Sequence, residues 1–370
     1  MGKEDTYILD IGSFSIKSGF LSEEFNEPSQ ITPSYLMQDF KTSETKEVGE
    51  ITYDDPKLVV REVIPNGVIA NRTSILSLFK KIFENENLEN LNGKSIIVSD
   101  YVNRPISQKK LITDLIMNTF GAERICFENS CILALSYYGK TSGCVVEVGH
   151  STTQIVNVYN GYKLKDGNLF ANFGSNYVGK YLQMLCDKNG YVFEPSLSRM
   201  VNQQIKETLC KVVDKKTSEM LKLINSTGVT ENLQFTLPDG EDMELGNEIY
   251  LANEIFFDSS IFSSDFKGLQ NMIDQSLNLI NVDLRKKLSN NICLTGGAFN
   301  TEGIEGRLNQ ELNMIFPKRA KVEVFGSNGL YEYIPWIGAN IMALSNPDVF
   351  KWVTKADYDE KGVDCLCEYI

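Results

Sequence analysis

Two stretches of alternating apolar and polar residues follow the same design along the chain. The first runs from Tyr7 to Phe20 and the second from Cys144 to Tyr159. Each indicates a β-branched strand that ends in an acidic residue, one further residue and a glycine, followed by a second alternating strand. The repetition indicates an internal duplication. Two ordinary hairpins of an α/β protein would carry the same pattern, so neither hairpin alone specifies a function.

Segments with helical periodicity lie between and after these strands. Residues 105–120 carry apolar positions at helical spacing, begin with proline in the first turn and stop at Gly121. Similar patterns predict helices over residues 178–187, 197–223 and 304–312. Because helices interleave with strands, the sequence predicts an α/β protein whose sheets are covered by helices on both faces.

Polar stretches mark the expected turns. Residues 40–55 contain a Lys-Thr-Ser-Glu-Thr-Lys-Glu run and predict an exposed loop or a small hairpin. Residues 225–228 and 237–240 predict turns, the second of them the turn of a hairpin. A chain of 370 residues exceeds what one hydrophobic core usually sustains, and no low-complexity linker divides it. We therefore expect two or more domains that pack together.

Composition and charge narrow the classes of function. Apolar residues make up 42% and charged residues 23%, as in ordinary globular proteins. Asp and Glu outnumber Lys and Arg by 49 to 36, so the summed field repels phosphate backbones. No direct contact with nucleic acid is expected, and any contact with chromatin would need partners. No apolar run approaches a membrane span and the N-terminus has no apolar signal core, so we expect no membrane association and a cytosolic or nuclear location.

Cysteine and histidine usage argues against a zinc site. The eight cysteines include no C-x-x-C pair, and His150 is the only histidine. The segment from Cys365 to Cys367 could chelate or oxidise, but reduced thiols are the favoured interpretation.

Three glycine turns carry the candidate chemistry. The turn of each hairpin exposes backbone N–H groups, and the acids Asp10 and Glu147 lie next to these turns, so two such hairpins facing each other can hold a phosphate chain. Farther along, an apolar strand over residues 292–295 runs into Gly296 and Gly297. Adjacent glycines let a flat ring or a phosphate approach the backbone, although an ordinary turn would look the same.

The order of these segments resembles the layout of the superfamily of actins, sugar kinases and Hsp70 ATPases. The resemblance narrows to actins and actin-related proteins and runs essentially from end to end. It rests on these segments, which follow one another in the family's order: Leu9-Asp10-Ile11-Gly12-Ser13, Lys17-Ser18-Gly19-Phe20, Ile205-Lys206-Glu207-Thr208-Leu209-Cys210, Leu237-Pro238-Asp239-Gly240, Gly246-Asn247-Glu248, Val282-Asp283-Leu284-Arg285-Lys286, Leu294-Thr295-Gly296-Gly297, Trp336-Ile337-Gly338 and the run from Trp352 to Gly362.

The resemblance implies an actin-like ATPase fold of the α/β class. Two related lobes would each hold a mixed β-sheet flanked by helices, with a nucleotide cleft between them. Subdomain 1 would comprise residues 1–31, 64–137 and 333–370, and subdomain 2, with a shortened loop, residues 32–63. Subdomain 3 would comprise residues 138–173 and 265–332, and subdomain 4 residues 174–264.

The same resemblance implies ATP or ADP with Mg²⁺ as cofactor. Asp10 and Glu147 would hold hydrated Mg²⁺ through water, while Lys17 and backbone N–H groups would neutralise phosphate charge. Lys206 and Glu207 would contact the adenosine. The complete set of implied cofactor-binding residues is Asp10, Gly12, Ser13, Lys17, Glu147, Gly149, Lys206, Glu207, Gly296 and Gly297.

Two departures from the family concern hydrolysis. In actins a glutamine and a histidine hold the attacking water in line with the γ-phosphate. A gapless alignment over residues 127–162 places Ser130 and Gln154 at these positions. Ser130 is too short to reach the water, and Gln154 cannot take a proton as an imidazole can. The sequence therefore offers no catalytic residue and predicts no efficient ATPase activity.

Further departures surround the phosphates and the adenine. In the second hairpin Glu147 and His150 replace aspartates and Ser151 replaces a glycine, and we interpret His150 as a loop substitution, not a catalytic base. Phe14 replaces a turn glycine; an inward ring would occupy the γ-phosphate space and an outward ring would leave binding intact. Glu332 stands where actins carry a lysine beside the adenine.

The resemblance leaves several functions open. A non-filament scaffold subunit, paired with actin or another actin-related protein in a chromatin-remodelling or histone-acetyltransferase complex, agrees best with the eroded catalytic pair and the short polar loop, which weakens head-to-tail polymerisation. A cytoskeletal protein (a filament, dynactin-type or nucleator subunit) with residual ATPase activity is the alternative. A sugar kinase or chaperone ATPase is a third. The expected location is correspondingly the nucleus, or the cytoplasm and its cytoskeleton.

Overall fold

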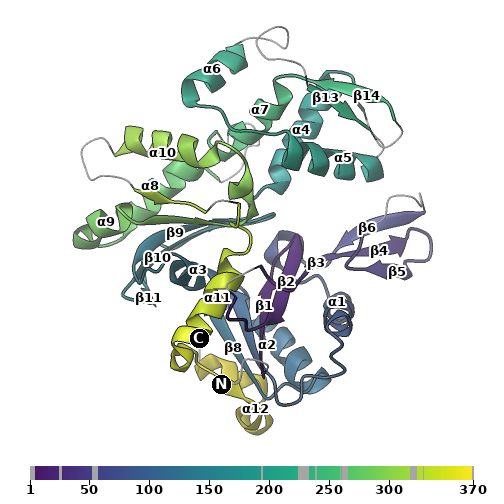
Figure 1. Cartoon of the computed structure of the whole chain (residues 1–370), viewed down its shortest axis with the longest axis vertical. Coiled ribbons are helices and arrows are strands. Elements are labelled where there is room, and N and C mark those ends of the chain that lie inside the picture. The colour runs from purple at the N-terminus through teal and green to yellow at the C-terminus, as the bar shows by residue number, and fades with distance from the viewer. Residues whose placement is uncertain are drawn as a thin grey trace. The chain divides into compact units, whose positions relative to one another are not determined.

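The computed structural model describes residues 5–24, 27–51, 57–192, 195–223, 233–237, 240–258, 260, 266–316, 323–327 and 329–368 (Figure 1). The chain divides into two compact units. The first comprises Met1–Ser142, Val158–Lys163 and Tyr333–Ile370, and the second comprises Gly143–Asn157 and Leu164–Glu332. The four subdomains expected from the sequence divide the chain more finely than these units, and their boundaries stay a prediction.

A six-stranded mixed sheet forms the centre of the first unit. Its strand order is β17-β8-β7-β1-β2-β3. Strands β1, β7 and β8 run parallel to one another, whereas β2, β3 and β17 pair antiparallel with their neighbours. The carboxyl ends of β1, β7 and β8 therefore meet at one edge. The strands are β1 (Thr6–Ile11), β2 (Ser15–Phe20), β3 (Gln30–Pro33), β7 (Ser95–Asp100), β8 (Arg124–Asn129) and β17 (Val353–Thr354).

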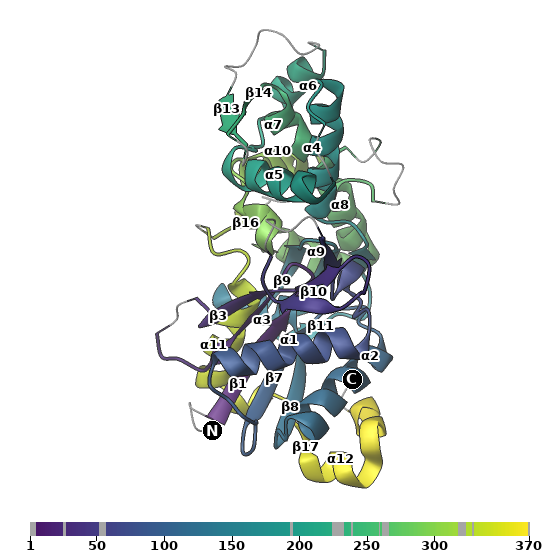
Figure 2. The same cartoon turned by 90° about the vertical axis from the view of Figure 1, so that its right-hand side faces the viewer.

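Helices cover both faces of this sheet because its buried strands are apolar on both sides. Tyr7 and Leu9 of β1 pack into one core with α1, α2 and the π-helical turn η3, whereas Ile8 packs into a second core with α3 and α11. Figure 2 shows α1 lying across the strands of this sheet. The helices of this unit are α1 (Arg72–Asn85), α2 (Ile106–Asp114), η3 (Leu115–Thr119), α3 (Ser130–Tyr137), α11 (Ile334–Ser345) and α12 (Lys355–Lys361), with short 3-10 turns at η2 (Pro65–Gly67), η7 (Pro347–Val349) and η8 (Gly362–Glu368).

Two of these helices pack backbone to backbone. A Cβ added to Gly338 of α11 would lie 1.9 Å from the carbonyl oxygen of Leu133 in α3, so only glycine allows this approach. Trp336, on the same helix, is almost completely buried in the core against this face of the sheet.

A separate antiparallel sheet in the first unit has the order β5-β4-β6, with β4 (Tyr35–Asp39), β5 (Thr45–Val48) and β6 (Leu58–Glu62). Between β4 and β5 the chain turns tightly, because the Asp39 carboxylate accepts hydrogen bonds from the N–H groups of Lys41 and Thr42, both at 2.8 Å. Of the two structures expected for residues 40–55, the described part forms the small hairpin. Residues 52–55 lie outside the described residues.

The second unit is built on another mixed sheet, in which β9 and β15 are parallel, as are β15 and β16. The strand order is β10-β9-β15-β16, and β10 also pairs antiparallel with β12. The last two residues of β10, Val158 and Tyr159, belong to the first unit, where they pair with β11. The strands are β9 (Gly143–Val148), β10 (Thr153–Tyr159), β11 (Tyr162–Lys163), β12 (Leu169–Ala171), β15 (Ile292–Thr295) and β16 (Val324–Phe325), with a separate hairpin of β13 (Leu233–Thr236) and β14 (Asp242–Leu245).

The helices of the second unit complete the α/β class predicted from the sequence. They are α4 (Asn176–Lys188), α5 (Pro195–Thr208), α6 (Lys215–Leu223), α7 (Glu248–Leu251), α8 (Leu269–Leu279), α9 (Val282–Ser289) and α10 (Ile304–Ile315), with 3-10 turns at η4 (Ala252–Phe256) and η6 (Gly297–Asn300). None of the described helices combines the length and the apolar character that a membrane crossing requires.

The predicted helix over residues 197–223 was wrong as a single element, because it breaks into α5 and α6. Between them the N–H of Lys211 donates to the carbonyl of Ile249 and that of Val212 to the carbonyl of Glu302. These bonds to other segments replace the helical ladder. Asp214 then caps α6 by accepting from the N–H of Thr217 at 3.1 Å.

The other predicted elements fared better. The helices over 178–187 and 304–312 are confirmed as α4 and α10, and residues 105–120 form α2 continued by η3. Gly240, at φ +86°, belongs to the turn that joins β13 to β14, although Pro238 and Asp239 lie outside the described residues. The turn predicted at residues 225–228 also lies outside the described residues.

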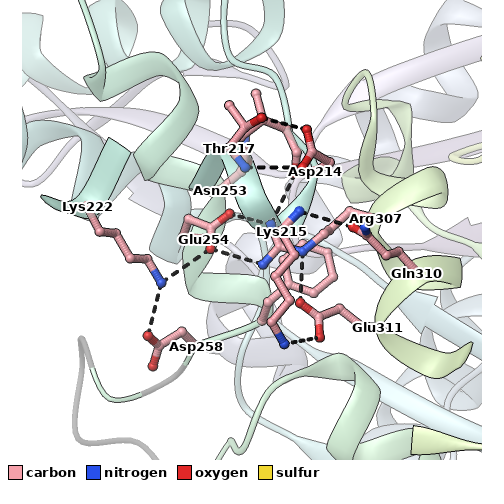
Figure 3. A network of polar contacts seen from close by, with 12 residues as sticks. Asp214, Lys215, Thr217, Lys222, Asn253, Glu254, Asp258, Arg307, Gln310 and Glu311 are labelled. Atoms are coloured by element: carbon pink, nitrogen blue, oxygen red, sulfur yellow. Dashed lines mark hydrogen bonds and ion pairs between the residues drawn. The ribbon is translucent and has the colours of Figure 1, made fainter. Parts of the chain in front are cut away.

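A buried ion-pair network stabilises the second unit behind the broken helix (Figure 3). The Arg307 guanidinium contacts Glu254 at 2.8 Å and Glu311 at 2.9 Å, and all three side chains are at most 6% exposed. One buried cation therefore faces two buried anions. The half-buried ammonium groups of Lys215 and Lys222 supply the missing charge, at 3.0 Å from Glu311 and 3.4 Å from Glu254 respectively.

Replacing Arg307 by methionine should lower the free energy of unfolding by about 3–5 kcal/mol, because two buried carboxylates lose their common partner. Urea unfolding followed by circular dichroism measures the effect. The matched control is Lys46→Met, which removes an exposed pair with Glu44 and should leave the free energy of unfolding nearly unchanged. Equal losses in the two variants would contradict the assigned role of the network.

Candidate functional site

The first hairpin places an acid and a lysine side by side next to its turn. In the register of β1 and β2, Asp10 lies opposite Lys17. A Cβ on Gly12 would lie 2.8 Å from the carbonyl oxygen of Ser15 and 3.8 Å from Nζ of Lys17. A side chain would therefore clash at Gly12, and the Lys17 ammonium lies directly over this glycine.

The oxygens of this turn are held from behind by neighbouring segments. Ser34 donates from its hydroxyl to the carbonyl of Gly12 at 2.7 Å and from its N–H to the carbonyl of Phe14 at 2.9 Å. The N–H of Gly67 donates to the hydroxyl oxygen of Ser13 at 3.1 Å. In a planar trans peptide the C=O and N–H point in opposite directions, so the N–H of Ser13 is directed to the side opposite Ser34.

The ring of Phe14 packs on the segment that follows Ser34. Its centroid lies 6.0 Å from that of Tyr35, and the rings meet edge to face at 82°. Tyr35 is buried, so this contact holds the Phe14 ring against the start of β4. Whether the ring occupies the γ-phosphate space stays a prediction.

The turn of the second hairpin is backed in the same way, here by the start of α4. The carbonyls of Gly149 and His150 accept hydrogen bonds from the N–H groups of Ser175 at 3.0 Å and Asn176 at 2.8 Å. A Cβ on Gly174 would lie 2.5–2.6 Å from these two carbonyl oxygens, so the glycine permits the approach. By the same peptide geometry, the N–H of His150 is directed away from α4.

Each hairpin carboxylate is oriented by one neutral donor. The hydroxyl of Ser99 donates to Oδ1 of Asp10 at 2.5 Å, and Nε2 of Gln154 donates to Oε2 of Glu147 at 2.6 Å. Among the described residues no three His, Cys, Asp or Glu side chains gather closely enough to ligate an ion directly. Within its own unit, each of the two carboxylates could accept hydrogen bonds from the water shell of a hydrated Mg²⁺.

The glycine pair lies beside the second hairpin. Glu147 is in register with Thr295, and Gly296, at φ +96°, leaves no room for a Cβ because one would lie 2.4 Å from the carbonyl oxygen of Val148. Gly297 is exposed, and only the Cβ of Glu332 approaches it, at 3.5 Å from where its own Cβ would be. A negative side chain therefore stands next to the glycine pair.

A concavity of about 390 Å³ in the second unit continues from this turn. It is lined mainly by the residues between the glycine pair and the first turn of α10, with Tyr331 opposite them. The Tyr331 hydroxyl donates to the Glu305 carboxylate at 2.7 Å. The lining residues are Phe299, Asn300, Thr301, Glu302, Gly303, Ile304, Glu305, Gly306, Asn309, Val324, Gly329 and Tyr331.

Lys206 and Glu207 lie in the last turn of α5, on another part of the same unit. Nζ of Lys206 donates to the side-chain oxygen of Gln203 at 2.7 Å, and the amide of Gln203 donates to Glu207. Burial lowers the pKa of the Lys206 ammonium to about 8. Lys206 is therefore a donor whose charge changes near neutral pH.

The structure brings the predicted residues together within each unit. Asp10, Gly12, Ser13 and Lys17 converge on the first turn, and Glu147 and Gly149 lie beside Gly296 in the second unit. Ser130, the first residue of α3, is buried at the carboxyl end of β8.

Sequence analysis missed the residues that hold these turns. They are Ser34, Gly67, Ser99, Gly174, Ser175 and Asn176. The sequence carries a partial signal for them, because several are small polar residues or glycines at or just after the end of a strand. Their pairing with a particular turn depends on tertiary contacts that no local pattern encodes.

These features define an α/β protein with one glycine-turn hairpin in each unit. A family model described as Actin matches residues 1–369, and the chain therefore belongs to the actin family. The fold class and the resemblance inferred from the sequence are thus confirmed, and the sugar kinase and chaperone alternatives are set aside. Proteins of this family generally bind ATP or ADP with Mg²⁺.

The pKa of Lys206 predicts selective reactivity with acetic anhydride. Only the neutral amine reacts, so the rate at Lys206 should rise with pH and reach half of its maximum near pH 8. Lys211 is the matched control, because its hydrogen bond and ion pair with Glu302 raise its pKa above the ordinary lysine value. Mass spectrometry of peptides from limited labelling measures both. Coincident pH profiles would contradict the depressed pKa.

Proposed function

We propose that this actin-family protein binds an adenine nucleotide with Mg²⁺, hydrolyses it inefficiently, and acts as a scaffold subunit of a multi-protein assembly. One observation carries the proposal. In both glycine turns the carbonyls accept hydrogen bonds from a neighbouring segment, so the N–H groups of the same peptides point to the other side. The two positions that place the attacking water in actins are occupied here by Ser130 and Gln154.

The residues of the two turns suit a polyphosphate. Lys17 supplies a positive charge directly over Gly12, and the outward N–H groups of Ser13 and His150 supply neutral donors. Mg²⁺, when bound, neutralises phosphate charge, and Asp10 and Glu147 would hold its water shell. The concavity beside Gly297 would take the adenosine end, with Lys206 and Glu207 as its further contacts.

Inefficient hydrolysis follows from what Ser130 and Gln154 can do. Ser130 is buried at the start of α3, and its side chain carries one hydroxyl on a single carbon. Gln154 is 3% exposed, and its amide is engaged with Glu147. Neither residue offers a titrating base near neutral pH, so aligned water and proton transfer both lack a dedicated group.

Nucleotide binding without turnover is directly measurable. ADP or ATP with Mg²⁺ should raise the melting temperature, corresponding to about 2.7 kcal/mol of added stability at a hundredfold excess over Kd. Phosphate release from ATP should stay far below that of a conventional actin assayed in parallel. Lys17→Ala should weaken binding by about 10-fold, since one charge-assisted contact is lost. No melting shift, or phosphate release at the rate of the conventional actin, would overturn the proposal.

The expected subdomain 2 segment, residues 32–63, favours a single copy in an assembly over a self-polymer. It turns tightly between β4 and β5, and this turn offers a neighbouring subunit little surface to grip. The net charge of −13 disfavours direct nucleic-acid contact, so chromatin would be reached through partners. By family analogy, the partners would be actin or another actin-related protein in a nuclear remodelling or acetyltransferase complex.

Affinity purification of the tagged protein distinguishes this proposal from the cytoskeletal alternative. We expect remodelling or acetyltransferase subunits in the eluate, and no sedimentation of the purified protein when ATP and salt are added. A tagged conventional actin is the control for both assays. Recovery of cytoskeletal partners alone, or pelleting filaments with stoichiometric phosphate release, would support the alternative, a filament, dynactin-type or nucleator subunit.

A further inference from the structure

The carboxylate of the second hairpin is held by the residue that stands where actins carry a catalytic histidine. Glu147 is the next-to-last residue of β9, and Gln154 is the second residue of β10, the neighbouring strand. Nε2 of Gln154 donates to Oε2 of Glu147 at 2.6 Å. Gln154 is buried, so this donor is fixed by the surrounding core.

Chain length explains why such a donor matters here. A glutamate has one more rotatable bond than an aspartate, so its carboxylate samples more positions unless a contact holds it. A hydrogen bond to one oxygen fixes the plane of the carboxylate and the direction of its lone pairs. The amide of Gln154 is a neutral donor and adds no charge of its own beside the carboxylate.

The first hairpin also has a neutral donor on its carboxylate, but that donor comes from a different strand. There the Ser99 hydroxyl donates to Asp10 at 2.5 Å from β7, the parallel neighbour of β1. Gln154 instead lies on β10, the second strand of its own hairpin. The contact between Gln154 and Glu147 is therefore not a copy of the one in the first unit.

We propose that Gln154 is a positioning residue that orients Glu147 toward the water shell of a nucleotide-bound Mg²⁺. This role rests on the proposed nucleotide binding and goes beyond it, because it assigns a function to a position otherwise interpreted only as a lost catalytic group. Groups that orient a metal-holding carboxylate commonly change metal affinity by 10-fold or more when removed. Gln154 thus contributes to Mg²⁺-dependent affinity without contacting nucleotide.

Gln154→Met tests the proposal, because methionine keeps the length of the side chain and removes the donor. Affinity for a fluorescent ADP analogue is measured with Mg²⁺ and again with EDTA. We expect the gain in affinity on adding Mg²⁺ to fall by about 10-fold, while the affinity in EDTA changes by less than about 2-fold. Gln38→Met is the matched control, since it removes an exposed amide bonded to Thr45, and should change neither value.

Glu147→Gln completes the experiment as a double-mutant cycle. If Gln154 acts through Glu147, adding Gln154→Met to Glu147→Gln should cause no further loss. Should Gln154→Met fail to fold, Gln154→Asn removes the contact by shortening the amide. An unchanged Mg²⁺ effect in a folded Gln154 variant would overturn this inference alone. A wild-type protein that binds no nucleotide would overturn the proposed function and this inference with it.

Discussion

The geometry of the trans peptide bond is the constraint on which both candidate phosphate turns depend. Once a neighbouring segment bonds a carbonyl of the turn, the N–H of the same peptide must face the other way. Ser34 imposes this on the first turn, and the start of α4 imposes it on the second. The two turns differ in sequence. In both, a hydrogen bond to a carbonyl directs the N–H of the same peptide to the other side. The duplication is thus conserved in hydrogen bonding more than in side chains.

Much of the fold could be predicted because its signals are local. Alternating apolar and polar residues followed by a glycine predict each hairpin. The helical spacing of apolar residues predicts α4 and α10. The prediction failed where hydrogen bonds to distant backbone groups end a helix. Residues 209–214 have helical periodicity, but bonds from Lys211 and Val212 to Ile249 and Glu302 end the helix. The spacing of hydrophobic residues indicates which face of a segment is buried. It does not indicate whether the backbone N–H groups bond within a helix or to another segment.

In the candidate site, too, local features could be predicted from the sequence and tertiary contacts could not. Residues of the turns, such as Asp10 and Gly12, could be named from motif and resemblance. The contact of Gln154 with Glu147 could not, because it depends on the register of neighbouring strands and on a substitution at each position. The place of the Phe14 ring likewise depends on Tyr35, which belongs to another sheet. Sequence therefore identified candidate ligand-binding groups, and the structure identified the groups that hold them.

The close packing of α11 on α3 has a consequence for the order of events during synthesis. Trp336 and Ile337 complete the core on one face of the first sheet, whose first strand begins at Thr6. α3 covers part of that face, but its other cover, α11, follows the whole of the second unit, which ends at Glu332. A nascent chain of this protein therefore exposes part of this apolar face until residues 334–345 have been made, and exposed apolar surface during synthesis favours aggregation.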